Sequence, residues 1–259
     1  MAEKAQPFLD LILEIFDSME QTVKDTFDSL SPPSTAAGIA PGTPNAAGTP
    51  GSPVTSVSQS LPPVDSGAET TRQLIKGLHS FKVVAECPII VVSIFQAHRS
   101  LAPKNVTKFT PKIKHTLLLQ AGPQKRAHDE AQARGDIFTG VAREIKVQGK
   151  APAFGELVTA QVKTMSFLAY LLRAYQSTLA DFLNYLPDLT VRLLRDVPRA
   201  HTATRKELLV AIRHIINFNF RAVFLPVILP LLDPRTLVGD SLTADVTLRP
   251  LAYLSLIHI

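Results

Sequence analysis

Residues 156–186 read ELVTAQVKTMSFLAYLLRAYQSTLADFLNYL, and this stretch decides the fold class. Its apolar side chains recur at intervals of three and four residues, at Leu157, Val158, Val162, Met165, Leu168, Leu172, Tyr175, Leu179, Phe182 and Leu186. An α-helix brings positions with this spacing to one face. The stretch therefore predicts one long amphipathic helix, which ends at Pro187 because proline cannot continue the backbone hydrogen bonding.

Two shorter helices are predicted on the C-terminal side of this stretch. Asp188 can cap a helix that runs to Arg195, and Val197-Pro198 interrupts it. Thr202 or Thr204 can cap the next helix, whose apolar positions are Leu208, Leu209, Ile212, Ile215 and Ile216. A helix followed by a proline-bearing break and another helix is typical of helix pairs.

The remaining pattern is also helical. A proline-kinked helix is predicted over residues 220–232, with turns between residues 233 and 240. Further helices are predicted from Glu69 onward. The segment Phe81–Phe95 is ambiguous, because its β-branched run Ile89-Ile90-Val91-Val92 would also suit a buried strand. No convincing set of alternating strands bounded by turn dipeptides occurs.

The first 68 residues divide into a helix and a linker. Residues 5–30 place apolar side chains at helical spacing, which predicts an amphipathic helix within residues 1–30: Phe8, Ile12, Ile15, Phe16, Met19, Val23, Phe27 and Leu30. Residues 31–64 hold eight of the twenty prolines and no charged or aromatic residue. Such a composition cannot bury enough apolar area to offset its ordering entropy, so residues 31–68 are expected to be a disordered linker.

The succession of helix pairs and short proline-bearing turns over residues 69–253 is what a degenerate HEAT-like α-solenoid looks like in sequence. We therefore expect an all-α fold made of HEAT-like repeats. A compact helical bundle would produce similar periodicities. Periodicity alone leaves the two architectures open.

Composition narrows the environment of the chain. Apolar residues make up 46% and charged residues 19% of the 259 positions, so some apolar surface is expected to meet another surface. The longest apolar runs fall short of the roughly 20 residues of a membrane helix, and the N-terminus lacks the pattern of a signal peptide. One cysteine, Cys87, fits a reducing compartment such as the cytosol or nucleus. No membrane partner is expected.

Charge is unevenly distributed. Residues 1–30 carry two lysines against seven acidic residues, whereas residues 65–259 carry 25 basic against 15 acidic residues. The basic side chains are scattered and no aromatic residues interleave with them, which favours solvated helix faces over a nucleic-acid site. We therefore expect no direct contact with nucleic acid.

Candidates for chemistry are few. Cys87 precedes a proline in an apolar run and has no basic neighbour to activate it, which favours a packing role. Metal-ligand spacing is absent among the histidines at positions 79, 98, 115, 128, 201, 214 and 258. Phosphate-binding and nucleophile-elbow motifs do not occur either. Glu207 and His214 share a predicted helix face, but such a pair is usually a solvated edge. We expect no catalytic residue, no metal site, no cofactor and no small-molecule substrate.

Several stretches resemble one family. They are Phe81–Val92 (FKVVAECPIIVV), Ala160–Tyr170 (AQVKTMSFLAY), Arg205–Ala211 (RKELLVA) with Arg213-His214-Ile215, and Leu248–Tyr253 (LRPLAY). Shorter matches are Phe220-Arg221, Phe224-Leu225-Pro226, Leu231-Leu232-Asp233, Pro7-Phe8-Leu9 and Phe27-Asp28. These segments resemble the TRRAP-type transcription-associated proteins, which are pseudokinases of the phosphatidylinositol 3-kinase-related family.

The resemblance implies a stretch of N-terminal HEAT-like repeats in a nuclear scaffold of SAGA-type and NuA-type histone acetyltransferase complexes. It implies transcription activators and complex subunits as protein partners, and it places the inactive kinase-like domain outside this chain. It also favours a helix for Phe81–Phe95. Residues 254–259 (LSLIHI) depart from the family pattern, so we expect a truncated or non-native tail there.

Two other functional interpretations remain open. A helical-repeat adaptor of the nuclear-transport or vesicle-coat type would share the solenoid without the quoted motifs. An enzyme with a site assembled from scattered residues would need a group such as Cys87, Glu207 or His214.

Overall fold

The computed structural model describes residues 2–28, 66–134, 141–175, 184–198, 201–216 and 221–228, together with residues 177, 179 and 182. Within these ranges every regular element is a helix and no strand occurs, which confirms the all-α fold class. The elements are α1 (Ala2–Asp17), α2 (Met19–Val23), the π-helix η1 (Lys24–Asp28), α3 (Ser66–Ala97), the 3-10 helix η2 (Arg99–Leu101), α4 (Ala102–Leu118), α5 (Gly122–Ala133), α6 (Arg143–Val147), α7 (Ala151–Tyr175), α8 (Leu186–Asp196), α9 (Thr202–Ile215) and α10 (Arg221–Ile228).

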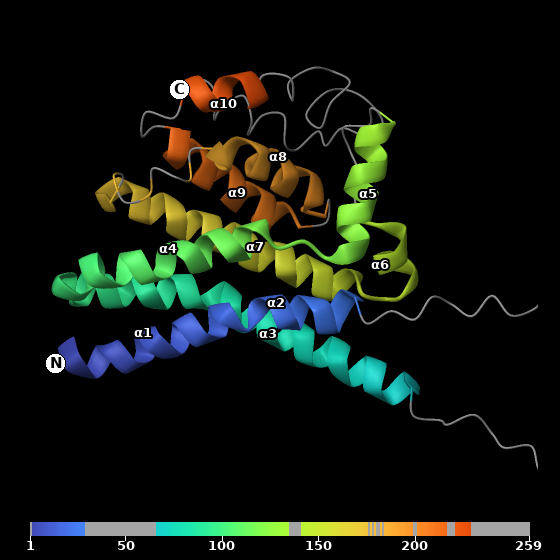
Figure 1. Ribbon diagram of the computed structural model, residues 1–259, viewed down its shortest axis with the longest axis horizontal. Helices are drawn as coiled ribbons and strands as arrows, with labels where there is room; N and C mark the ends of the chain where they lie inside the picture. Colours follow the sequence, from blue (N-terminus) through green and yellow to red (C-terminus); the bar gives the residue numbers. More distant parts are fainter. Residues whose placement is uncertain are drawn as a thin grey trace, which may run out of the picture.

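Helices α3, α7 and α9 form one layer and run in the same direction (Figure 1). The polar contacts between neighbouring helices show this, because later residues of one helix contact later residues of the next. Between α3 and α7, Lys82 lies 4.0 Å from Glu156. Four residues further along α3, Glu86 lies 2.8 Å from Lys163. Between α7 and α9, the hydroxyls of Thr159 and Thr204 lie 3.4 Å apart, and Ser166 contacts Glu207 at 3.3 Å further along both helices.

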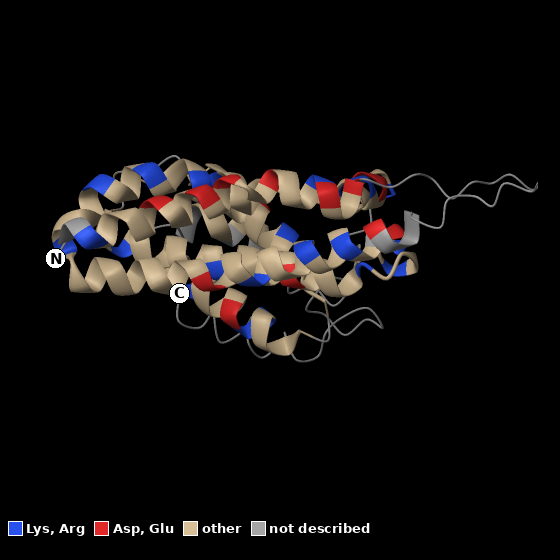
Figure 2. Ribbon diagram, turned by 90° about the horizontal axis from the view of Figure 1, so that it is seen from below, with Lys and Arg blue, Asp and Glu red and all other residues tan. Residues whose placement is uncertain are grey.

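Helices α1, α4, α8 and α10 form the second layer. α1 lies along α4, where Gln6 donates to Asn105 at 3.0 Å and Lys108 reaches Asp10 at 3.4 Å. α8 meets the end of α4 through Arg192, which donates to the Leu118 carbonyl, and α10 packs on α8. The acidic α1 therefore faces a basic side of α4 (Figure 2). Asp10 and Asp17 of α1 form ion pairs with Lys108 and Lys112 of α4.

The chain alternates between the two layers. Helix α3 is followed by α4 through η2, α7 is followed by α8, and α9 is followed by α10. The described helices therefore stack side by side as antiparallel pairs (Figure 1). Helices α5 and α6 lie between α4 and α7 in sequence. This repeated pairing is the arrangement of a HEAT-like solenoid rather than of a closed bundle.

The interior between the layers is aromatic. The ring of Phe109, on α4, contacts Phe16, Phe95 and Phe167 with centroids 6.2, 6.3 and 5.9 Å away, each in an edge-to-face arrangement. These rings come from α1, α3 and α7, and all are almost completely buried. Phe109 therefore joins the two layers at one point, with the geometry that aromatic pairs prefer.

The ambiguous segment Phe81–Phe95 is helical and lies inside α3, as the family resemblance implied. Its buried side chains follow helical spacing: Phe81, Val84, Cys87, Val91 and Phe95. By length and composition alone, Thr71–Ala97 is apolar enough to cross a membrane, a property that the short uninterrupted apolar runs of the sequence did not indicate. In the structure one side of this helix packs along α7, and 39% of its apolar window is buried.

The N-terminal helix differs from the expectation of one continuous helix over residues 5–30. Ser18 separates α1 from α2, and the last turn is the π-helix η1. The Ser18 hydroxyl donates to the Ile15 carbonyl at 2.8 Å, and Thr22 and Thr26 make similar bonds to carbonyls four residues earlier. Such back-bonding competes with the backbone ladder and bends helices.

The expected linker, residues 31–68, lies outside the described residues except at its end. Helix α3 begins at Ser66, three residues before the expected start at Glu69. The turns expected between residues 233 and 240 and the expected tail at 254–259 also lie outside the described residues.

The expectation of one helix over residues 156–186 was wrong at both ends. α7 begins at Ala151 and ends at Tyr175, and Pro187 lies in the first turn of α8. Proline is tolerated there, because the first N–H groups of a helix have no intrahelical acceptor. Asp188 lies inside that first turn, and Tyr185 is at the N-cap position.

The next boundaries agree more closely with the sequence. The chain becomes extended at Val197, as Val197-Pro198 predicted. The N-cap position of α9 is His201 rather than Thr202 or Thr204. α10 spans Arg221–Ile228 and contains Pro226, and the rest of the predicted helix over 220–232 lies outside the described residues.

Several carbonyl groups at helix ends accept hydrogen bonds from side chains of other segments. Lys150 donates to the Thr26 carbonyl at 2.6 Å, and Gln161 donates to the carbonyls of Thr116 and Leu119 at 3.0 and 2.8 Å. Arg205 donates to the Val197 carbonyl at 2.8 Å. The last carbonyls of a helix lack intrahelical donors, so these long side chains act as caps between neighbouring helices.

Candidate functional site

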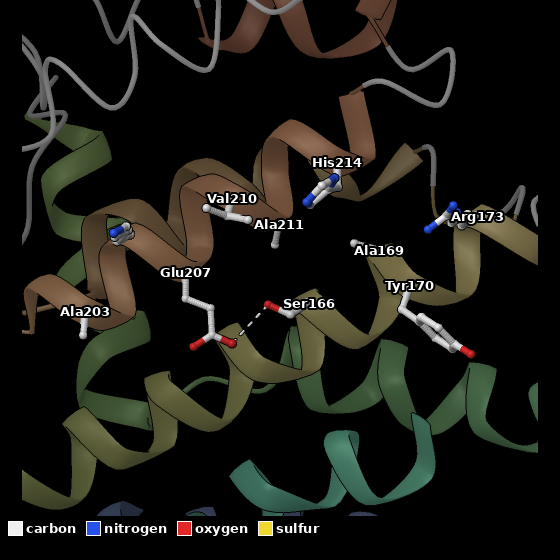
Figure 3. Close-up of a pocket in the computed structure, with 10 residues that line it drawn as sticks. Ser166, Ala169, Tyr170, Arg173, Ala203, Glu207, Val210, Ala211 and His214 are labelled. Carbon is white, nitrogen blue, oxygen red and sulfur yellow. Dashed lines mark hydrogen bonds between the residues drawn. The ribbon is translucent and has the colours of Figure 1, made fainter. Parts of the chain in front are cut away.

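An apolar cavity on the outer surface of the α3–α7–α9 layer lies between α7 and α9 (Figure 3). Its volume is about 550 Å³, within the range of ordinary ligand and peptide pockets. One wall is on α7 and the other on α9: Ser166, Ala169, Tyr170, Arg173, Ala203, Lys206, Glu207, Val210, Ala211 and His214. We call this feature the α7–α9 groove.

The two walls meet closely at one end of the layer and leave space at the other. A Cβ atom added to Gly155 would lie 2.5 Å from Cε1 of His201, so the absence of a side chain allows the helices to approach there. Further along, the bridge between the helices requires the long side chain of Glu207, whose carboxylate accepts from Ser166 at 3.3 Å. The groove opens around and beyond this bridge, toward Arg173 and His214 (Figure 3).

The rim of the groove is mainly basic. Arg173 and Lys206 are exposed, and no hydrogen bond or ion pair engages either of them within the described part of the chain. Glu207 is the acidic lining residue, and its hydrogen bond to Ser166 holds it at the α7 wall. The floor consists of small aliphatic side chains, including Ala169 and Ala211. The groove can therefore accept apolar side chains flanked by negative charge.

Glu207 and His214 both line this groove, but they lie at different places along α9 and do not form a pair (Figure 3). His214 is exposed near the open end, and Glu207 is engaged by Ser166. Their shared helix face was predicted correctly. What the sequence did not indicate is that this face borders a cavity.

Cys87 is buried in α3, and its thiol donates to the Val83 carbonyl at 3.3 Å. Burial raises the pKa of this thiol from its ordinary value of 9.0 to about 11, and the neighbouring Glu86 carboxylate acts in the same direction. The thiolate form is therefore suppressed at neutral pH. This environment is typical of a packing cysteine.

The described histidines occupy separate places. His79 is exposed and His98 is half-buried at the N-cap of η2, whereas His115 lies 3.3 Å from Glu20. His201 packs against Gly155 at the start of α9. His258 lies outside the described residues.

His128 is different, because it lies in a buried polar cluster between α5 and α8. Its Nε2 lies 2.7 Å from Oδ1 of Asp196, which also accepts from Gln124 at 2.8 Å. Arg192 lies 3.9 Å from the other carboxylate oxygen. Burial lowers the pKa of Arg192 and of Arg195, and the charge of Asp196 opposes this change. The cluster joins α5 to α8, and no sequence pattern indicated it, since its members are up to 72 residues apart.

Among the described residues no group of three or more His, Cys, Asp or Glu side chains is arranged to hold a metal ion. The His128 cluster contributes one histidine and one carboxylate, and its other members are cations or amides.

Comparison with known proteins identifies the relatives of this chain. Residues 153–258 match the family described as the Tra1 HEAT repeat central region. The chain is 39% identical over 196 residues, or 75% of its length, to the "SAGA complex/NuA4 acetyltransferase complex subunit TRA1" of Saccharomyces cerevisiae. It is 35% identical over 96% of its length to the corresponding subunit of Schizosaccharomyces pombe. The chain belongs to the Tra1 family.

The Tra1 family extends to animals. The human "Transformation/transcription domain-associated protein" is 31% identical over 99% of this chain. The chain spans only about 5 to 6% of the length of these curated relatives. The resemblance noted in the sequence implied N-terminal HEAT-like repeats, and the matching family description refers to the central region.

Homology to Tra1 proteins supports the helical-repeat architecture independently of the helix pattern. The matched region starts inside α7 and includes α8, α9 and α10, and so contains both walls of the α7–α9 groove. The groove is therefore part of a HEAT-repeat region.

Proposed function

We propose that this chain is a non-catalytic scaffold segment of a transcription coactivator subunit of SAGA-type and NuA-type histone acetyltransferase complexes. The observation that carries the proposal is the similarity of nearly the whole chain to proteins named as subunits of those complexes. In this role the segment offers helical surfaces to transcription activators or to other subunits, and it works in the nucleus.

The exposed side of α1 and α3 supports a role in contact with other protein surfaces. Phe8 and Leu11 on α1 are 63% and 53% exposed, and Ile89 and Ile90 on α3 are 65% and 46% exposed. Phe8, Ile89 and Ile90 line a shallow depression of about 580 Å³. Apolar patches of this kind mark interaction surfaces on soluble proteins.

We propose a division of the chain that follows its sequence. Residues 1–30 form one segment of the solenoid that contains α1, α2 and η1, a low-complexity linker follows up to the start of α3 at Ser66, and the HEAT-like repeat segment extends from there to residue 253. The ion-paired contact of α1 with α4 supports the assignment of the first segment to the same solenoid as the repeats.

The proposal is tested by affinity purification of the natural protein that contains this chain, followed by quantitative mass spectrometry. Acetyltransferase subunits are expected to co-purify in near-stoichiometric amounts, and a tagged protein is expected in the nucleus. Purification without those subunits, or exclusion from the nucleus, would defeat the proposal and favour an adaptor of the transport or vesicle-coat type. The names of the two yeast relatives and of the human relative refer to acetyltransferase complexes or to transcription, which favours the scaffold over the adaptor.

The non-catalytic part of the proposal has its own test. The residues considered for chemistry are separated: Cys87 is buried in α3, whereas Glu207 and His214 lie on α9. Turnover that a substitution at Cys87, Glu207 or His214 abolishes would contradict the proposal.

A further inference from the structure

We propose that the α7–α9 groove binds a short amphipathic helix of a partner protein, with its apolar face on the groove floor and carboxylates on its flanks. The inference rests on the proposed scaffold function and assigns one surface and one partner chemistry to it. Three properties of the groove lead to this partner: its shape, its floor and its unengaged charges.

The shape suits a helix because the groove is elongated along two helices that run in the same direction. Its α9 wall extends from Ala203 to His214, which corresponds to about 16 Å at 1.5 Å per residue. That length matches about three turns of a helix. The helices approach each other closely at Gly155 and His201, before the lining begins, and the groove extends from there toward Arg173 and His214.

The floor suits aliphatic side chains. Ala169 on α7 and Ala203 and Ala211 on α9 leave room between the walls, and Val210 stays 37% exposed beside them. Small residues at such positions allow the backbone of a partner helix to come close. Leucine-sized side chains at helical spacing would remove this apolar surface from water.

The charges select the flanks of the partner. Arg173 stands on the α7 side and Lys206 on the α9 side, and within the described ranges neither makes an ion pair. The one lining carboxylate, that of Glu207, is already bonded to Ser166. A partner with acidic flanks would pair with both cations, whereas a basic partner would face two like charges.

The binding test uses the full protein and a defined probe. The probe is a fluorescein-labelled helical peptide of about four turns, with leucines at positions i, i+3, i+4 and i+7 and glutamates on both flanks. A second peptide has lysine in place of each glutamate. Fluorescence anisotropy should show saturable binding of the glutamate peptide that weakens as salt is raised, and much weaker binding of the lysine peptide.

Charge reversal locates the site. The double variant Arg173→Glu/Lys206→Glu should bind the glutamate peptide at least about tenfold more weakly and should gain affinity for the lysine peptide. The control is Lys125→Glu, which places the same kind of charge change on an exposed position of α5, outside the groove. It should bind both peptides like the unchanged protein.

The inference is overturned if the glutamate peptide does not bind, if both peptides bind equally, or if the double variant retains full affinity. Gain of affinity for the lysine peptide shows that the double variant is folded. Co-purification of acetyltransferase subunits is measured on the same proteins. If acetyltransferase subunits do not co-purify with the unchanged protein, the scaffold function is contradicted. If they co-purify but the peptide does not bind, only the assignment of the groove is contradicted.

Discussion

The ammonium group of Lys150 donates to the carbonyl oxygen of Thr26 at 2.6 Å, although 124 residues separate them in sequence. Lys150 is 3% exposed, and Thr26 lies in the π-helix η1. Burial lowers the pKa of Lys150, and the charge of Asp28 opposes this change. A buried lysine of this kind is costly unless its donors are used, so the bond to η1 is a structural requirement rather than a surface contact.

Replacement Lys150→Met keeps the aliphatic stem and removes the donor. The Thr26 carbonyl then has no partner from Lys150, which should destabilise the contact between η1 and the start of α7 by about 1–3 kcal/mol. Hydrogen exchange measured by mass spectrometry should show faster exchange in peptides that cover residues 24–28. Lys146→Met, at an exposed position of α6, is the control and should leave that exchange unchanged. Unaltered exchange in Lys150→Met would contradict the role of the bond.

Replacement Gly155→Ala should loosen the narrow end of the α7–α9 layer. The new methyl group would lie 2.5 Å from Cε1 of His201, and the imidazole must move to accommodate it, at a cost of about 1 kcal/mol. In a His201→Ala background the same substitution should be neutral or stabilising, because alanine favours a helix over glycine. A double-mutant cycle of unfolding free energies measures this coupling. Equal effects in both backgrounds would show that the contact does not limit the approach of the helices.

Replacement Asp196→Ala should be among the more destabilising single changes. It removes the carboxylate that accepts from Gln124 and contacts His128, and it leaves Arg192 buried without its counter-charge. Breaking a buried charge pair in this way costs about 3–5 kcal/mol. Asp188→Ala, at an exposed position of the same helix, serves as the control and should cost about 0.5 kcal/mol or less. Thermal unfolding followed by circular dichroism distinguishes them, and similar midpoints would refute a central role of the cluster.

Alkylation of Cys87 should have an unusual pH dependence. Because its pKa is raised from 9.0 to about 11, the reactive thiolate is about 100-fold rarer at pH 8 than for an ordinary cysteine. The rate with iodoacetamide should therefore reach half of its maximum near pH 11, whereas in protein unfolded in urea it should reach half of its maximum near pH 9. A half-maximal rate near pH 9 in the folded protein would contradict the burial of the thiol.

The same pKa shift affects stability. Between about pH 9 and pH 11 the unfolded chain loses the thiol proton while the folded protein keeps it. A folded-state pKa that is raised in this way contributes stability at lower pH, and that contribution is lost as pH rises through this window. Unfolding free energy should therefore fall over pH 9 to 11 more steeply than in Cys87→Ala.

Helix faces were readable from the sequence where local spacing determines them. In α3 the buried positions Phe81, Val84, Cys87, Val91 and Phe95 keep helical intervals, and the β-branched run obscured this because Ile89 and Ile90 are exposed. Boundaries were harder to predict. Leu179 and Phe182 remain buried beyond the end of α7, so apolar spacing continues where the α-helix does not.

The features that form the candidate site are mostly non-local. The shared face of Glu207 and His214 follows from helical periodicity, but the groove beside it depends on how Gly155 packs against His201, 46 positions away in the sequence. The pairing of His128 with Asp196 spans 68 residues. Contacts of this kind depend on the stacking of repeats, which no short sequence pattern encodes.

The side chains that complete the carbonyl ends of η1, α4 and α8 all come from later in the chain: Lys150, Gln161, Arg192 and Arg205. A ribosome adds about 5–20 residues per second, so Thr26 is incorporated about 6 to 25 seconds before Lys150, which lies 124 residues later. During that interval water must satisfy the Thr26 carbonyl. These carbonyl ends therefore receive their final donors only after later parts of the chain have been synthesised.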